Sequence, residues 1–121
     1  MLIAYWIIAA LTALAVLGAG VFKLVRSKQQ LAASGMAWTE DFGPTQIKLI
    51  GVAEVLGAIG LIVPMATGIL PILSPIAGVL LAVVMIGAAV VHLRRSEPPI
   101  PFAIAALALA ASVLGFLVVL G

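Results

Sequence analysis

Cysteine is absent from the sequence, and histidine occurs only once. Without cysteine the chain has no disulfide bonds, thiol nucleophiles, CxxC redox motifs or thiolate metal sites. A single histidine cannot supply both axial ligands of a bis-histidine haem, and together with the scattered acidic residues it lacks the ligand spacing of a zinc or di-iron site. We therefore expect no metal site and no cofactor held by this chain alone.

Charged residues are also scarce, at 8% of the 121 residues, whereas 65% of the residues are hydrophobic. A soluble domain of this composition would lack the polar side chains that are needed to cover its surface. The formal net charge of +2 is only weakly basic and gives no indication of nucleic-acid binding. The composition places the chain in a lipid bilayer, without a soluble catalytic domain, so we expect no independent catalytic activity.

Four long apolar segments dominate the sequence, at residues 2–24, 44–64, 72–91 and 101–120. Each segment has about the 20 residues that a helix needs to cross the hydrocarbon core of a bilayer. The sequence therefore predicts an all-α fold, an integral membrane four-helix bundle that forms a single transmembrane domain over residues 1–121. The first segment follows no positively charged region and precedes no small-residue cleavage site, so we expect it to be retained and not removed as a signal peptide.

The longest connection, from Val25 to Gly43, mixes charged residues with Leu31 and Trp38. This composition is typical of a short segment that lies in the membrane interface. Trp38 in this connection and the Arg94–Arg95 pair after the third span are candidates for contacts with lipid headgroups, because tryptophan and arginine side chains favour that layer.

The basic residues are unevenly divided between the two sides of the membrane. Because successive spans alternate in direction, all six lysines and arginines fall on one side, namely Lys23, Arg26, Lys28, Lys48, Arg94 and Arg95. The connection on the other side, residues 65–71, carries no charge. By the positive-inside rule the basic side faces the cytoplasm. We therefore expect a multi-pass protein of the cell membrane with both termini extracytoplasmic.

Glu54 is an acidic residue placed inside a predicted span. It lies ten residues beyond Pro44, or about 15 Å along a helix, near the bilayer centre, where a charge is costly. Its neighbours at helical spacing include Gly51, Gly57 and Ala58, so it is expected to face a closely packed helix and not lipid. Two interpretations are open: a ligand-binding or proton-titrating carboxylate, and a member of a buried polar network that fixes the helix register.

Lys23 and His92 end the first and third spans, on the same half of the membrane as Glu54. Small residues precede both at helical spacing, so the three ionisable side chains are expected to converge as a ligand-binding or proton-titrating site. Each also has an alternative interpretation. Lys23 could extend to the membrane interface, as lysines at span ends commonly do. His92 could form a basic collar with Arg94 and Arg95 that contacts anionic lipid.

The last span carries a stripe of small residues, Ala105, Ala108, Ser112 and Gly115, and Ser112 is its only polar side chain. Small residues at this spacing allow two helices to approach closely. The pattern indicates either a structural scaffold or a surface for oligomerisation.

Three segments contain most of these features: GVFKL at residues 20–24, KLIGVAEVLGAIGLIVP at residues 48–64 and MIGAAVVHLRR at residues 85–95. With them the chain resembles the DoxX-like family of small four-span bacterial membrane proteins along nearly its whole length. The resemblance places Lys23, Glu54 and His92 within recurring motifs of the family. It implies kinship with a small subunit of a thiosulfate:quinone oxidoreductase, and with relatives that are associated with membrane redox complexes in the defence against oxidative stress.

Three functions are compatible with the sequence. The leading hypothesis is a small integral membrane subunit or accessory protein, associated with a quinone-linked or oxidative-stress redox complex, in which Lys23, Glu54 and His92 bind a headgroup or a quinone. The second is a small proton-coupled transporter that acts as an oligomer, although the small multidrug resistance transporters carry their essential acid on the first span, where this chain has none. The third is a purely structural helper subunit.

The expected partners follow from these hypotheses. They are the lipid bilayer and either a larger membrane complex or a second copy of this chain, but not nucleic acid.

Overall fold

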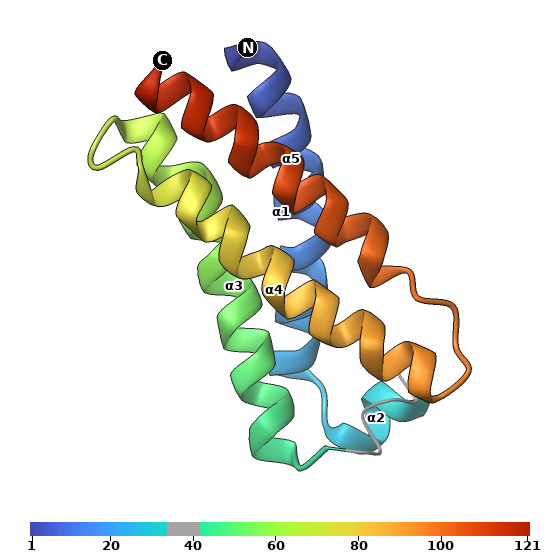
Figure 1. The fold of residues 1–121 in the computed structure, drawn as a ribbon. Coiled ribbons are helices and arrows are strands. Elements are labelled where there is room, and N and C mark those ends of the chain that lie inside the picture. The colour runs from blue at the N-terminus through green and yellow to red at the C-terminus, as the bar shows by residue number, and fades with distance from the viewer. Residues whose placement is uncertain (34–41) are drawn as a thin grey trace.

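The computed structural model describes residues 1–33 and 42–121, in which helix is the regular secondary structure. The helices are α1 (Leu2–Val25), α2 (Lys28–Ala33), α3 (Pro44–Thr67), α4 (Leu73–Arg94) and α5 (Pro101–Leu120) (Figure 1). Four of them, α1, α3, α4 and α5, are long and apolar enough to cross a membrane. The predicted all-α membrane bundle of four helices is therefore confirmed.

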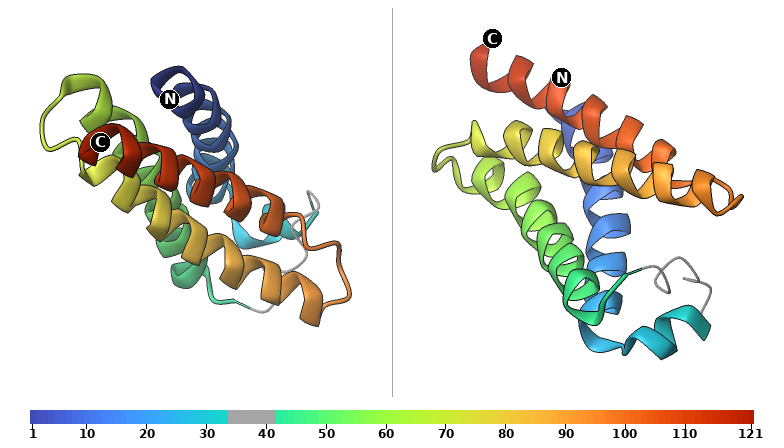
Figure 2. Two further views of the ribbon diagram at one scale, coloured as in Figure 1. Left: turned by 45° about the horizontal axis from the view of Figure 1, so that its top comes forward. Right: turned by 60° about the horizontal axis from the view of Figure 1, so that its bottom comes forward.

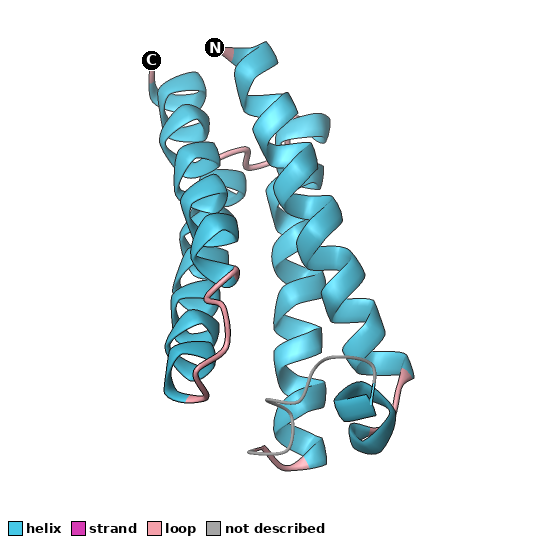
Figure 3. Cartoon of the chain, turned by 90° about the vertical axis from the view of Figure 1, so that its right-hand side faces the viewer, coloured by secondary structure: helices cyan, strands magenta, loops and turns pink. Residues whose placement is uncertain are grey.

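The four long helices form two layers, with α1 beside α3 in one and α4 beside α5 in the other (Figure 3). Contacts between α3 and α4 and between α5 and α1 join the layers into a closed ring. The helices of one layer cross those of the other obliquely (Figure 2). Both termini lie at one end of the bundle, and α2 lies at the opposite end (Figure 1).

Three spans extend beyond their predicted ends, α1 by a single residue and α3 and α4 by three residues each. The third helix of the chain, α3, continues past Pro64 to Thr67, because a proline in the last turn removes only one backbone donor. Side chains from other helices bond to the backbone near this turn: the Tyr5 hydroxyl donates to the Leu61 carbonyl, and the Met65 N–H donates to Ser74 Oγ at 3.0 Å. The next helix, α4, continues past its predicted end at residue 91 and ends at Arg94, so His92 lies in its last turn.

The connection between α1 and α3 contains the short helix α2. It begins with a capping box, in which the Ser27 N–H donates to Gln30 Oε1 and the Gln30 N–H donates to Ser27 Oγ. Leu31 is fully buried and attaches α2 to the end of the bundle. This helix corresponds to part of the interfacial segment that the sequence predicts, whereas Trp38 lies outside the described residues.

Small side chains fill much of the interior, and large apolar side chains cover the outside. Within the described part of the chain, nine alanines are buried: Ala9, Ala13, Ala58, Ala77, Ala82, Ala89, Ala105, Ala108 and Ala111. By contrast, Ile3 is 77% exposed and Leu14 is 70% exposed. This distribution suits a bilayer, where lipid covers the large apolar side chains and close packing of small residues holds helices together.

The small-residue stripe of the last span lies inside the chain. Ala105, Ala108, Ser112 and Gly115 are all buried, and Gly78 of α4 packs against this stripe. A Cβ atom on Gly78 would lie 3.1 Å from the Ala108 carbonyl oxygen and would overlap Ser112 Oγ. The stripe therefore acts as the predicted scaffold, in contact with α4.

We predict that Gly78→Leu destabilises the bundle by about 1–3 kcal/mol or more, because the new side chain would have to displace the backbone of α5. The control is Gly87→Leu in the same helix, where a Cβ atom would have no neighbour within 4 Å. Thermal unfolding in detergent measures both variants. Equal midpoints for Gly78→Leu and Gly87→Leu would contradict the close α4–α5 contact.

Candidate functional site

Lys23 and Glu54 form an ion pair inside the bundle. The Lys23 Nζ atom lies 2.6 Å from Glu54 Oε1. Both residues are buried, with exposed fractions of 5% for Lys23 and 1% for Glu54. Lys23 lies in the last turn of α1, yet its side chain pairs with the interior of the bundle. The structure therefore differs from the alternative in which Lys23 extends to the membrane interface.

Two glycines explain why these side chains meet. Gly20 precedes Lys23 by three residues, and Gly51 precedes Glu54 by three residues, so each glycine lies about one turn from the charge. A Cβ atom on Gly20 would lie 2.9 Å from the Gly51 carbonyl oxygen, and one on Gly51 would lie 3.0 Å from the Gly20 carbonyl oxygen. The backbones of α1 and α3 approach each other here as closely as only glycine permits, which brings the charged side chains within bonding distance.

Lys48 binds the end of α1, a role that its position in the sequence did not predict. Its Nζ atom donates to three carbonyl oxygens, at 2.9 Å from that of Lys23, 2.8 Å from that of Leu24 and 2.8 Å from that of Arg26. The last carbonyls of a helix have no partner within the helix and carry the negative end of its dipole. A lysine from α3 therefore supplies both the missing donors and the favourable charge.

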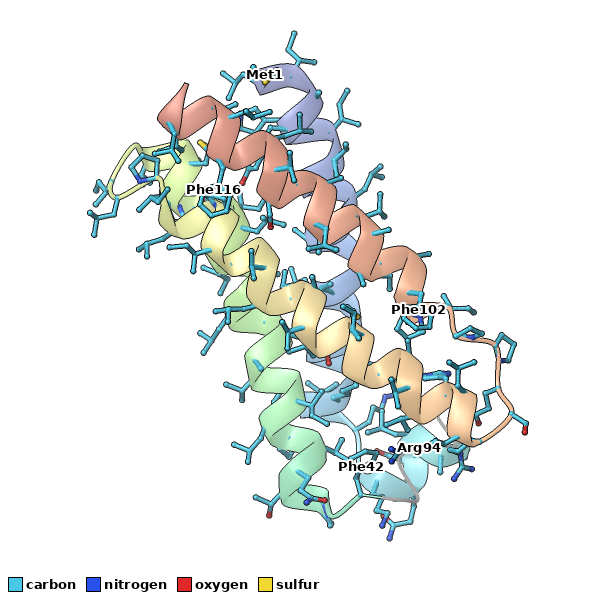
Figure 4. The ribbon with its side chains drawn as sticks, in the orientation of Figure 1. Met1, Phe42, Arg94, Phe102 and Phe116 are labelled. Carbon is cyan, nitrogen blue, oxygen red and sulfur yellow. The ribbon has the colours of Figure 1, made fainter. Side chains whose placement is uncertain are left out.

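A cavity of about 530 Å³ adjoins the ion pair, between the two helix layers and toward the α2 end of the bundle. This volume falls in the range of small-molecule sites, about 300–1,000 Å³. All four membrane-spanning helices contribute to its walls. Phe42, which is labelled in Figure 4 and lies just before α3, also lines the cavity. Among the residues that the structure describes, its ionisable lining residues are Lys23, Glu54 and His92, and the other lining residues are apolar. The half of the bundle near the termini is instead filled by buried side chains such as Tyr5 and Leu61.

Glu54 presents one oxygen atom that is buried and lacks a hydrogen-bond partner. Its Oε1 atom accepts from Lys23, but Oε2 has no donor among the residues that the structure describes. A buried acceptor without a donor is unfavourable by about 1–3 kcal/mol, and by more when it is charged. Among the residues that the structure describes, Glu54 is also the acidic residue that lines the cavity.

His92 lines the same cavity, but it lies close to Glu97, a residue that the sequence analysis did not identify as a candidate. His92 Nδ1 lies 3.6 Å from Glu97 Oε1, and Arg95 Nε lies 3.4 Å from Glu97 Oε2. Glu97 belongs to the α4–α5 connection and therefore brings His92 and Arg95 together. The site thus has a buried ion pair of Lys23 and Glu54, whereas His92, on the cavity wall, lies beside Glu97.

The predicted headgroup contacts have different positions. Arg94 is exposed at the end of α4 (Figure 4). Arg95 is partly buried beside Glu97, and Trp38 lies outside the described residues. Within residues 1–33 and 42–121, histidine and acidic side chains do not gather in groups of three or more that could hold a metal ion.

These features define a small membrane protein of four spans, with a buried ion pair at one end of an apolar cavity. The chain belongs to the DoxX-like family, whose model matches residues 7–115 and includes Lys23, Glu54 and His92. The resemblance noted in the sequence is therefore confirmed. No curated protein and no solved structure matches the chain.

We predict that Lys23→Met and Glu54→Leu each destabilise the protein by about 3–5 kcal/mol, because each removes one partner of a buried ion pair. The double variant Lys23→Met/Glu54→Leu should be more stable than either single variant, since it removes both charges and keeps apolar volume. Thermal unfolding in detergent at neutral pH measures the stabilities of the parent protein, the two single variants and the double variant. Lys28→Met is the control, as it removes a lysine from α2 outside the ion pair. Additive losses in the double variant would show that the two charges do not interact.

Proposed function

We propose that this chain is a small membrane subunit or accessory protein of a quinone-linked redox complex, and that its cavity binds a lipid-soluble ligand of the quinone class. The observation that carries this proposal is the position of the Lys23–Glu54 pair at the wall of an otherwise apolar cavity. Polar side chains beside apolar walls suit a molecule with a hydrogen-bonding head and an apolar body.

Other ligand classes fit this cavity less well. A charged, water-soluble molecule would have to leave water for a cavity whose walls are mostly apolar, which is unfavourable. A plain hydrocarbon chain would contact the apolar walls but would place no polar group beside the Lys23–Glu54 pair. A quinone-class molecule combines a ring that bears oxygen atoms with an apolar tail, and the DoxX-like resemblance favours this class because it implies kinship with quinone-linked complexes.

A redox reaction of such a ligand would need a partner. The chain has no cysteine and a single histidine, so its own side chains cannot supply a bis-histidine haem and lack the ligand spacing of a zinc or di-iron site. The electron-transferring group would then belong to another subunit of the complex. Large apolar side chains on the outer faces of the helices, such as Leu14 and Leu49, provide surfaces for lipid, for that subunit or for a second copy of this chain.

The orientation forms part of the proposal. Lys23, Lys48, Arg94 and Arg95 lie at or near helix ends on the side of α2, opposite both termini. We propose that this side faces the cytoplasm of a bacterial cell, following the positive-inside rule. Arg94 would then lie at the level of the inner lipid headgroups.

The orientation predicts the accessibility of single cysteines, which can be introduced at Gln29 in α2 and at Gly121 because the chain has no other thiol. On intact cells a membrane-impermeant thiol reagent should label Gly121→Cys and should label Gln29→Cys only after permeabilisation. The opposite pattern would place the termini in the cytoplasm.

Ligand binding can be tested with a short-chain benzoquinone, supplied in its oxidised and in its reduced form. Ala88 lines the cavity, so Ala88→Trp should fill it and lower the affinity for either form by about tenfold or more. Ala53→Trp is the matched control, because Ala53 is exposed on α3 next to Glu54 and does not line the cavity. Titration calorimetry of the purified proteins measures the affinities. If the parent protein binds neither form, or if both tryptophan variants bind like the parent, the cavity is not a quinone-class site.

A further inference from the structure

We propose that the cavity opens sideways to the bilayer between α3 and α4, at Gly87, and that its ligand keeps a hydrocarbon tail in the lipid while its head lies beside the Lys23–Glu54 pair. This inference rests on the proposed function and adds the class of ligand, a long-tailed amphiphile that is taken from the membrane. The observation behind it is that Gly87 lines the cavity and is also exposed.

The helices α3 and α4 are in close contact near their connection and separate toward α2. A Cβ atom on Gly60 would lie 3.0 Å from Ala77 Cβ, and one on Gly57 would overlap the Leu81 side chain. More than one turn beyond Leu81, a Cβ atom on Gly87 would meet nothing within 4 Å. The two helices diverge in the same direction in Figure 1 and Figure 2, and the cavity lies where they have separated.

Gly87 belongs to the outer surface of α4 as well as to the cavity wall. It follows Leu80 by seven residues and Val83 by four, which places all three on one face of the helix. Leu80 is 61% exposed and Val83 is 62% exposed, so this face is directed toward lipid. A residue that lines the cavity and shares the outer face lies at the rim of an opening, and a glycine has no side chain to close it.

The opening lies at the depth of the hydrocarbon layer. Gly87 precedes Arg94, the last residue of α4, by seven residues, or about 10 Å along the helix. With Arg94 at the level of the headgroups and a hydrocarbon core about 30 Å thick, lipid tails and not water surround Gly87. A molecule that reaches the cavity through this opening therefore comes from the bilayer.

This geometry separates the head of a ligand from its tail. The volume of about 530 Å³ suits a ring-sized head, with polar groups supplied by Lys23 and Glu54. A long hydrocarbon tail gains little from being enclosed, because lipid tails are as apolar as the cavity walls. The opening allows such a tail to remain in the lipid while the head is bound.

The experiment compares two probes on the protein in lipid nanodiscs: a benzoquinone without a tail and the same ring with a long alkyl tail. We expect Gly87→Trp to weaken binding of the tailed probe by about tenfold or more, because the indole closes the opening. Binding of the tail-less probe should change by about twofold or less, since the space beside the ion pair remains. Titration calorimetry measures both affinities, and each probe is compared only with itself between proteins, so that its partition into the membrane cancels.

Two tryptophan variants serve as controls. Val83→Trp adds the same side chain to the same face of α4 without lining the cavity, so both probes should bind as they do to the parent. Ala15 of α1 is exposed and lines the cavity on the side of α5, where the wall includes the larger residues Ile100 and Ile104. We expect Ala15→Trp to leave the ratio of the two affinities unchanged.

The outcomes separate this inference from the proposed function. If Gly87→Trp binds the tailed probe like the parent, or if Ala15→Trp alone lowers the ratio, the tail does not leave between α3 and α4 and the inference is wrong. Equal weakening of both probes by Gly87→Trp would also overturn it, because head and tail would then share one space. If the parent binds neither probe, the proposed function fails as well. Gel filtration establishes whether Gly87→Trp is folded, and Gly87→Leu makes the same comparison with a smaller side chain.

Discussion

The contact between α1 and α3 is the constraint on which the rest of the structure depends. In a bilayer two apolar helices gain little from leaving lipid, so their association relies on close packing and on polar contacts. Gly20 and Gly51 provide the close packing, and the Lys23–Glu54 pair provides the polar contact about one turn away. Each side chain alone would be a costly charge in an apolar medium, whereas together they compensate each other. Lys48 adds a second polar link between the same helices, at the end of α1.

The division of the bundle into a filled half and a hollow half follows from side-chain size. Near the termini, Tyr5, Leu61 and Leu81 occupy the space between the layers. Toward α2 the residues that face each other include several small ones, such as Ala15, Ala19 and Ala88, and the layers leave a cavity between them. The ion pair borders this cavity. The interaction that stabilises the fold therefore also places polar groups at the cavity wall.

The sequence predicts much of this arrangement, because hydropathy and small-residue spacing are local properties. The four spans and the inward position of Glu54 follow from them. The direction of the Lys23 side chain could not be predicted in this way, because a lysine at a span end can reach either the interface or the interior. The close contact between α1 and α3 at Gly20 decides between these two directions. The partners of His92 and Lys48 could not be predicted from the sequence either. Glu97 lies in a connection, and the carbonyl groups that bind Lys48 belong to the backbone, which no side-chain pattern records.

The central claim is that Glu54 is an ionised carboxylate, paired with Lys23 inside the membrane. Infrared spectroscopy of protein labelled with ¹³C at the glutamate side-chain carboxyl, in lipid at neutral pH, tests it most directly. Subtracting the spectrum of Glu54→Gln isolates the signal of Glu54 from those of Glu40 and Glu97. The account predicts the paired symmetric and antisymmetric stretches of a carboxylate at Glu54. A carbonyl stretch of a protonated acid at Glu54 would contradict it.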